Sequence, residues 1–157
     1  MKSITYPLNI RSIILEIAPD IIIKSYIFKF IDLHTFYPLT FFLDITHIHN
    51  YGVSIGLLAN LVSSNIIILL GLIVVMFIFY LMLSSSSNLE QWGLLIIISG
   101  AISNILDRFL NGFVIDFIYF HYKDFYWPAF NFADIYITIG IIMIVINILR
   151  KINNSIS

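Results

Sequence analysis

The sequence contains no cysteine, which excludes disulfide bonds, a thiolate nucleophile and cysteine-based metal sites. It is also poor in charge, because only 11% of its 157 residues are Asp, Glu, Lys or Arg, whereas a soluble domain carries roughly a quarter. Hydrophobic residues make up 60% of the chain, and its mean hydropathy is +0.98. The net charge of -1 and the scattered Lys and Arg provide no basic field for nucleic acid. This composition predicts an integral membrane protein that does not bind nucleic acid.

Four apolar segments are long enough to cross a bilayer core of about 30 Å. The clearest of them has no charged side chain over residues 66–83. We predict one mainly α-helical domain over residues 1–157, a four-transmembrane-helix bundle with spans at about 10–30, 66–83, 93–110 and 132–149. Aromatic, β-branched and polar residues mix between the spans, which predicts a small extracytoplasmic β-rich element at about 32–64 and 112–130.

The first span carries three charged residues at a spacing of four, Glu16, Asp20 and Lys24. On a helix they form one polar stripe, in which Asp20 and Lys24 can pair. Two interpretations stay open. The stripe is either an ion pair that neutralises two charges for membrane insertion or a direct contact with a substrate.

The third span has a polar stripe as well. Helical spacing places Gly100, Asn104, Asp107 and Asn111 on one face, which we expect to line the interior of the bundle. Arg108 lies beside this stripe, where it is available to pair with an acid or a lipid phosphate. Polar groups at membrane depth are costly enough that they are usually functional.

Two further acids lie near the predicted outer surface. Asp116 is in the middle of an apolar, aromatic run that alternates like a strand. Asp134 opens the last span, three residues after Asn131, in a relative of the capping box. A carboxylate at that position is stabilised by the helix dipole whether or not it takes part in chemistry.

Two histidines, His47 and His49, are predicted to share one face of a strand, which is the minimum for a metal site. No third ligand follows at a suitable spacing. We therefore expect surface polar side chains here, with no metal and no cofactor.

The distribution of positive charge predicts the orientation in the membrane. Lys2 and Arg11 near one end of the chain, and Arg150 and Lys151 near the other, favour cytoplasmic termini by the positive-inside rule. An even number of spans then places Asp116 and Asp134 at the outer face of a cytoplasmic (inner) membrane.

Five segments occur in an order and a frame that carry a specific resemblance. They are Asp20 with Lys24, Asn50-Tyr51-Gly52, Asn104-Ile105-Leu106-Asp107-Arg108, Gly112-Phe113-Val114-Ile115-Asp116-Phe117, and Trp127-Pro128-Ala129-Phe130-Asn131-Phe132-Ala133-Asp134. The chain resembles the bacterial lipoprotein signal peptidases (signal peptidase II), which are four-span aspartic proteases. The similarity extends from about Asp20 to Gly140.

The resemblance implies a membrane endopeptidase that removes the signal peptide of prolipoproteins by cutting just before a diacylglyceryl-modified cysteine. It implies that Asp116 and Asp134 are the catalytic pair. It also implies that the residues binding substrate or supporting the site are Asn50, Gly52, Asn104, Asp107, Arg108, Asn131, Asp20 and Lys24. The expected partners are the lipid-modified signal peptide and membrane lipid, and we expect a monomer. Three positions depart from the family's pattern, and they are Tyr119, Ile55 and Pro19.

The chemistry of two acids can also be argued without the family. Two carboxylates held close together cannot both ionise cheaply, so one keeps a proton while the other activates a water molecule. No serine-lysine pair, serine-histidine pair or HExxH motif competes with them. The alternatives are a small four-span transporter that uses intramembrane acids as a proton or cation relay, and a noncatalytic assembly factor.

Overall fold

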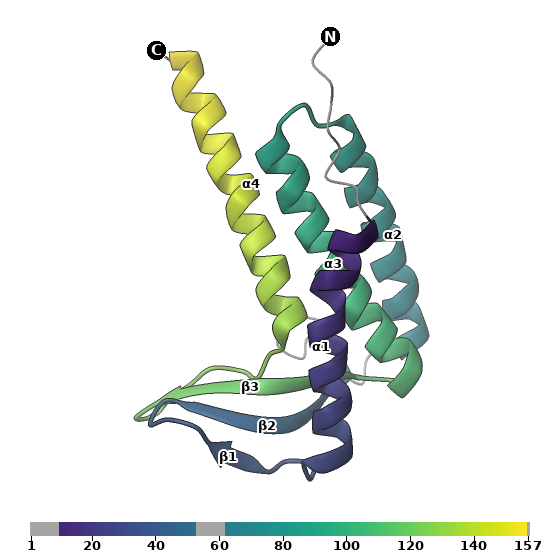
Figure 1. Cartoon of the computed structure of the whole chain (residues 1–157), viewed down its shortest axis with the longest axis vertical. Coiled ribbons are helices and arrows are strands. Elements are labelled where there is room, and N and C mark those ends of the chain that lie inside the picture. The colour runs from purple at the N-terminus through teal and green to yellow at the C-terminus, as the bar shows by residue number, and fades with distance from the viewer. Residues whose placement is uncertain (1–9, 53–61, 157) are drawn as a thin grey trace.

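The computed structural model describes residues 10–52 and 62–156, which form long helices and a small antiparallel sheet (Figure 1). The helices run alongside one another, and the sheet lies across one end of them. The elements in chain order are α1 (Ile10–Phe30), β1 (Phe36–Pro38), β2 (Leu43–Asn50), α2 (Ser64–Ser84), α3 (Asn88–Asn111), β3 (Val114–Tyr122), β4 (Phe125–Tyr126) and α4 (Phe132–Ile156). The expected mainly helical fold with a small β element is therefore confirmed.

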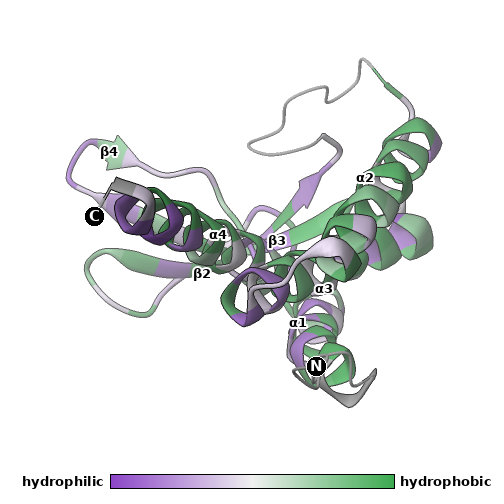
Figure 2. Ribbon diagram, turned by 90° about the horizontal axis from the view of Figure 1, so that it is seen from above, coloured by the Kyte–Doolittle hydropathy of each residue, from purple (hydrophilic) through white to green (hydrophobic). Residues whose placement is uncertain are grey.

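Three helices are long and apolar enough to cross a membrane, namely α2, α3 and α4. Figure 2 shows α2 hydrophobic over nearly its whole surface, which suits a helix surrounded by lipid. α1 is 21 residues long but carries charged residues along its length, including Asp20 and Lys24, so length and composition alone do not identify it as a span.

α3 is the central helix, because it packs against α1, α2 and α4. Small residues allow the contact with α4 to be close. A Cβ atom added to Gly100 would lie 2.5 Å from the carbonyl oxygen of Ala133, closer than real side chains come. A Cβ atom added to Gly93 would similarly meet the backbone of Gly140, so small residues allow α3 and α4 to approach closely.

The sheet has the strand order β1-β2-β3-β4, with antiparallel neighbours. β3 pairs with β2 so that Asp116 lies opposite Ile48. Near its other edge, the amides of Phe117 and Ile118 both donate to the carbonyl of Phe130, just before α4 begins. These bonds bring the strand that carries Asp116 next to the start of the helix that carries Asp134.

The alternation of β3 separates a face that packs on α1 from a face that lines the pocket described below. Ile115 and Phe117 are buried and pack with Ile27 of α1 in a hydrophobic cluster. Because successive strand residues point to opposite faces, Asp116 is directed away from this cluster.

Two boundaries differ from the sequence prediction. α3 begins at Asn88, earlier than the span predicted from about residue 93. The hydroxyl oxygen of Ser87 accepts a hydrogen bond from the amide of Glu90, so Ser87 is an N-cap, and an acid in the first turn adds a favourable dipole interaction. α4 continues to Ile156, beyond the apolar run that predicted it.

α3 ends as the sequence predicted. Gly112 follows it with φ of 83°, a left-handed conformation that glycine adopts without strain. The carbonyl of Gly112 accepts a hydrogen bond from the Ser64 hydroxyl at 2.5 Å, which ties the start of α2 to the end of α3.

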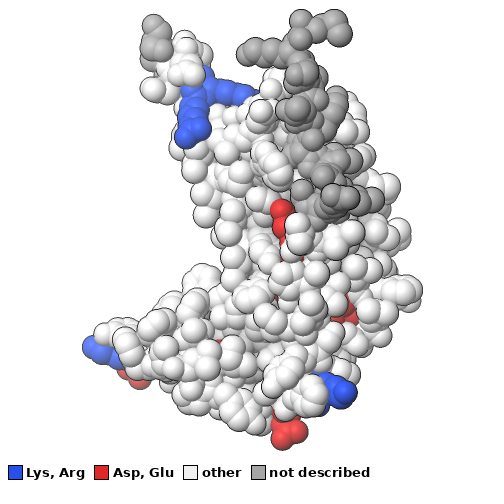
Figure 3. Space-filling model, viewed as in Figure 1, with Lys and Arg blue, Asp and Glu red and all other residues white. Residues whose placement is uncertain are grey.

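Charged side chains are sparse on the face drawn in Figure 3. Lys and Arg lie at the far end of α4 and near the sheet, and the belt between them shows no Lys or Arg and only a few acidic atoms. Such a belt is typical of a surface that faces hydrocarbon.

Candidate active site

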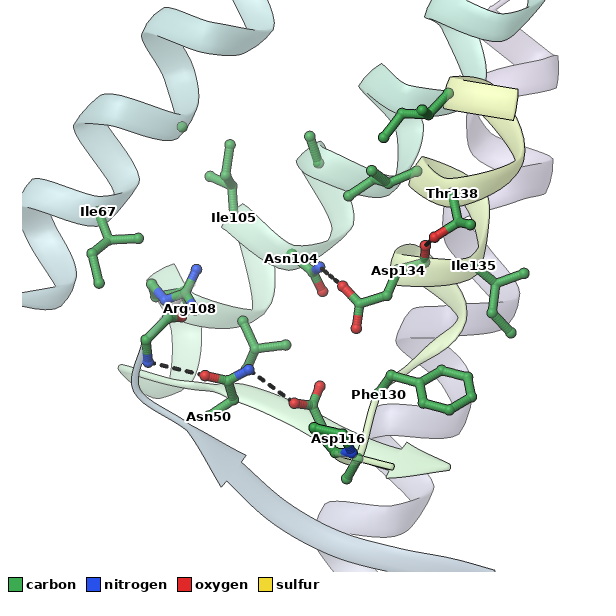
Figure 4. Close-up of a pocket in the computed structure, with 18 of the residues that line it drawn as sticks. Asn50, Ile67, Asn104, Ile105, Arg108, Asp116, Phe130, Asp134, Ile135 and Thr138 are labelled. Atoms are coloured by element: carbon green, nitrogen blue, oxygen red, sulfur yellow. Dashed lines mark hydrogen bonds between the residues drawn. The ribbon is translucent and has the colours of Figure 1, made fainter. Parts of the chain in front are cut away.

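A pocket of about 870 Å³ lies between the helices and the sheet (Figure 4). Its walls come from α2, α3 and α4, from β3, and from the segment around Phe130. Most of the lining is apolar, and two carboxylates, Asp116 and Asp134, open into it. The predicted site residues that line this pocket are Asn50, Gly52, Asn104, Arg108, Asp116 and Asp134.

Asp116 is placed on the pocket by the alternation of β3 and is only 3% exposed. One carboxylate oxygen accepts a hydrogen bond from the Asn50 amide at 2.9 Å, and the other accepts one from the Asn131 amide at 2.6 Å. Burial, and after it the negative charge of Asp134, raise the pKa of Asp116 to about 7, against the opposing effect of the two amides. At neutral pH this carboxyl is therefore poised to hold or release a proton.

Asp134 lies in the first turn of α4. Its amide donates to the side-chain oxygen of Asn131 at 3.0 Å, and its carboxylate accepts from the backbone amide of Asn131 at 3.1 Å. This reciprocal pair confirms the predicted capping box. The second carboxylate oxygen accepts from the Asn104 amide at 3.0 Å. Asp134 is thus a cap whose carboxylate also faces the pocket (Figure 4).

The loop after β2 is held against α3. The side-chain oxygen of Asn50 accepts from the amide of Gly52 at 3.0 Å, so one amide group binds both this turn and Asp116. The Arg108 guanidinium donates to the Gly52 carbonyl at 2.5 Å.

Arg108 does not form the ion pair that the sequence left open, because no carboxylate of the described residues lies within 4.0 Å of it. Its Nε atom is buried and, among those residues, has no hydrogen-bond partner. Arg108, which lies at the edge of the pocket, therefore has a buried Nε–H group with no acceptor among the described residues.

Three predicted site residues, Asp20, Lys24 and Asp107, lie behind the pocket rather than on it. The ammonium of Lys24 is 2.8 Å from Asp20 and 3.5 Å from Asp107, and all three side chains are buried. The predicted Asp20–Lys24 pairing is confirmed. Lys24 and Asp107 line a second, smaller cavity of about 470 Å³, so the alternative interpretation, a direct contact with a substrate, stays a prediction.

His47 and His49 lie side by side, as expected for one face of β2, with their Nε2 atoms 3.0 Å apart. The expectation of surface side chains is wrong for His47, which is buried. The second ring nitrogen of His47 lies 2.8 Å from the carbonyl of Ile31. Burial, above all, lowers the pKa of His49, which favours the neutral imidazole. Within residues 10–52 and 62–156, no group of three or more potential ligands is arranged to hold a metal ion.

Sequence reasoning missed two parts of the site. The hydroxyl of Ser103 donates to Asp20 at 2.7 Å, a contact that was not predicted, although the position of Ser103 on the polar stripe of α3 could have indicated it. The pocket wall formed by Ile67 and Gly71 of α2 had no signal in the sequence, because every residue around them is apolar as well.

The family model described as "Signal peptidase (SPase) II" matches residues 12–150 of this chain. The chain belongs to the signal peptidase II family. Among its relatives in that family, the lipoprotein signal peptidase of Thermodesulfovibrio yellowstonii is 37% identical over 141 residues, which cover 89% of this chain and 93% of the relative. That of Pseudoalteromonas atlantica is 31% identical over 139 residues, which cover 86% and 85%.

The fold has solved counterparts as well. A bacterial membrane enzyme solved by the in meso method superimposes with a TM-score of 0.84 and 26% sequence identity, over 92% of this chain and 89% of that chain. A second such structure gives a TM-score of 0.78 at 26% identity, over 89% and 91%. As a member of the signal peptidase II family, the chain is a protease with apolar helices that are compatible with membrane insertion.

The positions that depart from the signal peptidase II pattern lie in different surroundings. The ring of Tyr119 packs against Phe36 at 5.1 Å between centroids, on the sheet. Pro19 lies inside α1, which continues through it. Ile55 lies outside the described residues.

Proposed function

We propose that this protein is an aspartic endopeptidase of the bacterial cytoplasmic membrane that removes the signal peptide from diacylglyceryl-modified prolipoproteins, cutting before the lipidated cysteine. Its relatives are lipoprotein signal peptidases, which supports prolipoproteins as the substrate class. One observation carries the aspartic mechanism. Two carboxylates from separate elements, Asp116 of β3 and Asp134 of α4, open into one apolar pocket, and amide groups hold each of them.

In the proposed reaction the two carboxyls share one proton. The ionised carboxylate accepts a proton from a water molecule, whose oxygen attacks the scissile carbonyl. The protonated carboxyl donates to the developing oxyanion, and a proton then passes to the leaving amine. Asn50 and Asn131 orient Asp116, and Asn104 orients Asp134, so that little reorganisation is needed in the transition state.

The apolar lining suits a substrate that arrives sideways from the membrane. Side chains such as Ile67 and Val74 of α2 face Ile137 and Ile141 of α4 across the pocket. Acyl chains and an apolar signal peptide can contact these walls while the peptide bond lies at the carboxylates. Arg108 also lines the pocket, where its positive charge attracts a carbonyl or phosphate oxygen of the substrate or of a membrane lipid.

The proposed topology has four spans, with α1 as the first. α1 runs toward the sheet and α4 away from it, so that both outer ends of the bundle point the same way (Figure 1). The pairing of Lys24 with Asp20 removes net charge from α1, which makes insertion less costly. With Arg150 and Lys151 at the end of α4 in the cytoplasm, the sheet and the two aspartates lie at the outer face.

The alternative transporter and assembly-factor functions gain no specific support. Membership in a peptidase family argues against both. In addition, Asp116 lies on a strand beside the bundle, whereas a relay across the bilayer would need polar groups along the whole pocket.

The deciding experiment is a cleavage assay with the purified full chain in detergent and a synthetic prolipoprotein that carries a diacylglyceryl-cysteine. Mass spectrometry should locate the cut directly before that cysteine, with EDTA present, because the proposed reaction uses no metal. The same precursor without lipid is the matched control substrate and should be cut much more slowly. A protein that folds, binds the lipidated precursor and leaves it intact would contradict the proposal.

A further inference from the structure

Lys24 is the centre of a buried network between α1 and the elements that carry the two aspartates. Its side chain is 3% exposed. The ammonium lies 2.8 Å from Asp20 and 3.5 Å from Asp107, and it donates to the side-chain oxygen of Asn104 at 2.8 Å. These three partners match the three N–H groups of a lysine.

Each acid in this network holds the backbone immediately before one of the proposed catalytic aspartates. Asp20 accepts a hydrogen bond at 3.2 Å from the backbone amide of Ala133, the residue before Asp134. In the same way, Asp107 accepts from the amide of Ile115 at 2.8 Å, the residue before Asp116. The start of α4 and the start of β3 are thereby tied to a single ammonium group.

The third partner of Lys24 is Asn104, which donates a hydrogen bond to the side chain of Asp134, one of the two proposed catalytic residues. The Asn104 amide has one accepting and one donating end, and an ammonium can only donate. Lys24 therefore occupies the oxygen of Asn104 and leaves the NH₂ group for the carboxylate of Asp134. If Lys24 were absent, the oxygen of Asn104 would lose this donor, and the bond to Asp134 would hold the amide from one end only.

We propose that Lys24 is a positioning residue that sets the separation and orientation of Asp116 and Asp134 by holding Asp107, Asp20 and Asn104. The inference rests on the proposed function of the two aspartates. Removing one partner of a buried ion network leaves the other charges uncompensated, which costs free energy. The network is therefore most stable when Lys24, Asp20 and Asp107 keep this one arrangement. Lys24 itself does not line the pocket and is not assigned any contact with the substrate.

The first test compares Lys24→Met with Lys29→Met. Lys29 is an exposed lysine on the same helix, so its substitution is the matched control. Steady-state cleavage of the lipidated precursor should show kcat lowered by about 100-fold in Lys24→Met, because a displacement of about 1 Å is enough for such a loss. The KM should stay near the wild-type value, and Lys29→Met should match the wild type in both constants. A folded Lys24→Met protein with normal kcat would overturn the inference.

A milder variant covers the case in which Lys24→Met does not fold. Ser103→Ala removes only the hydroxyl that donates to Asp20 at 2.7 Å and leaves all charges in place. We expect kcat to fall by about two- to tenfold, the equivalent of one hydrogen bond, with KM unchanged. If both constants stay at the wild-type values, or if only KM rises, Asp20 does not position the pair and the inference fails.

A third readout does not depend on cleavage. The chain has no cysteine of its own, so Asp116→Cys and Asp134→Cys can be combined and joined by a short bifunctional thiol reagent. Crosslinking should become several-fold slower when Lys24→Met is added, and it should not change with Lys29→Met. Equal crosslinking rates would overturn the inference even if the wild-type protein cleaves the precursor. A clear difference would support it even if the proposed substrate is wrong.

Discussion

Asn131 bonds Asp116 through its side-chain amide at 2.6 Å, while its backbone amide bonds Asp134 at 3.1 Å. One residue, fully buried, therefore touches both proposed catalytic acids. The side chain of Asn131 therefore caps α4 and also binds Asp116. Its oxygen accepts from the backbone amide of Asp134, and its nitrogen donates to the carboxylate of Asp116.

Asn131→Ala should lower cleavage and raise the pKa of Asp116 further above its ordinary value, because a donor that favours the ionised form is lost. The loss of the cap should lower the free energy of unfolding by about 1 kcal/mol. Infrared titration of the Asp116 carboxyl, with thermal unfolding alongside, measures both effects. An unchanged pKa of Asp116 would show that the 2.6 Å contact has no energetic effect on the carboxylate.

Asp116→Asn and Asp134→Asn should each abolish turnover while the protein still inserts and folds. The double substitution should be no worse than either single one, because the effects of substitutions in one catalytic unit are not additive. The exposed acid Asp124 provides the control Asp124→Asn, which should be fully active. Single-turnover cleavage of the lipidated precursor is the measurement.

The role of Asp134 as a cap leads to a different expectation for the same variant. If Asp134 only stabilised α4, Asp134→Asn would cost well under about 1 kcal/mol of stability through the dipole and leave cleavage nearly normal. Substantial turnover by either single variant would remove that residue from the catalytic pair.

Asp116 should also make stability depend on pH. Its pKa in the folded protein is about 7, above the ordinary value of 3.8, so between these values the folded state holds a proton that the unfolded state has lost. Stability should therefore fall as pH rises from about 4 to 7. Asp116→Asn removes this penalty, so at pH 8 its free energy of unfolding should exceed that of the wild type by on the order of 4 kcal/mol, with little difference at pH 4. A difference that is the same at both pH values would contradict the assigned pKa.

Arg108→Lys keeps the charge but loses the planar fork. The guanidinium holds the carbonyl of Gly52 at 2.5 Å, and its Nε atom is free among the described residues. Losing one charge-assisted hydrogen bond is worth about 1.5–3 kcal/mol, so we expect kcat/KM to fall by roughly tenfold or more with little change in expression. Arg150→Lys, an exposed position at the end of α4, is the control. Normal activity of Arg108→Lys would reduce Arg108 to an anchor at the membrane interface.

The topology can be tested with reporters that are active on only one side of the membrane. A fusion after Lys151 should report the cytoplasm, and an insertion near Lys123, in the turn between β3 and β4, should report the outer side. The opposite pattern would place the two aspartates on the cytoplasmic face and overturn the proposed route of the substrate.

The sequence alone determined those features that depend on neighbouring residues. Apolar composition and length predicted membrane helices, since a bilayer excludes unpaired polar groups wherever a segment crosses it. Asn131 and Asp134 could be recognised as a capping box because the two residues are three positions apart, and Gly112 could be recognised as a helix end. The spacing of Asp20 and Lys24 predicted their ion pair in the same way.

Only the tertiary structure decided which of these groups meet. Asn50 reaches Asp116 across 66 residues, and Lys24 reaches Asn104 across 80, and no periodicity in the sequence relates such positions. Their meeting depends on the pairing of β2 with β3 and on close packing of α3 against α1 and α4. The physical reason is that local spacing sets the direction in which a side chain points, whereas the packing of whole elements sets what it meets. For Asp20 and Lys24, this packing placed the pair away from the pocket that Asp116 and Asp134 line.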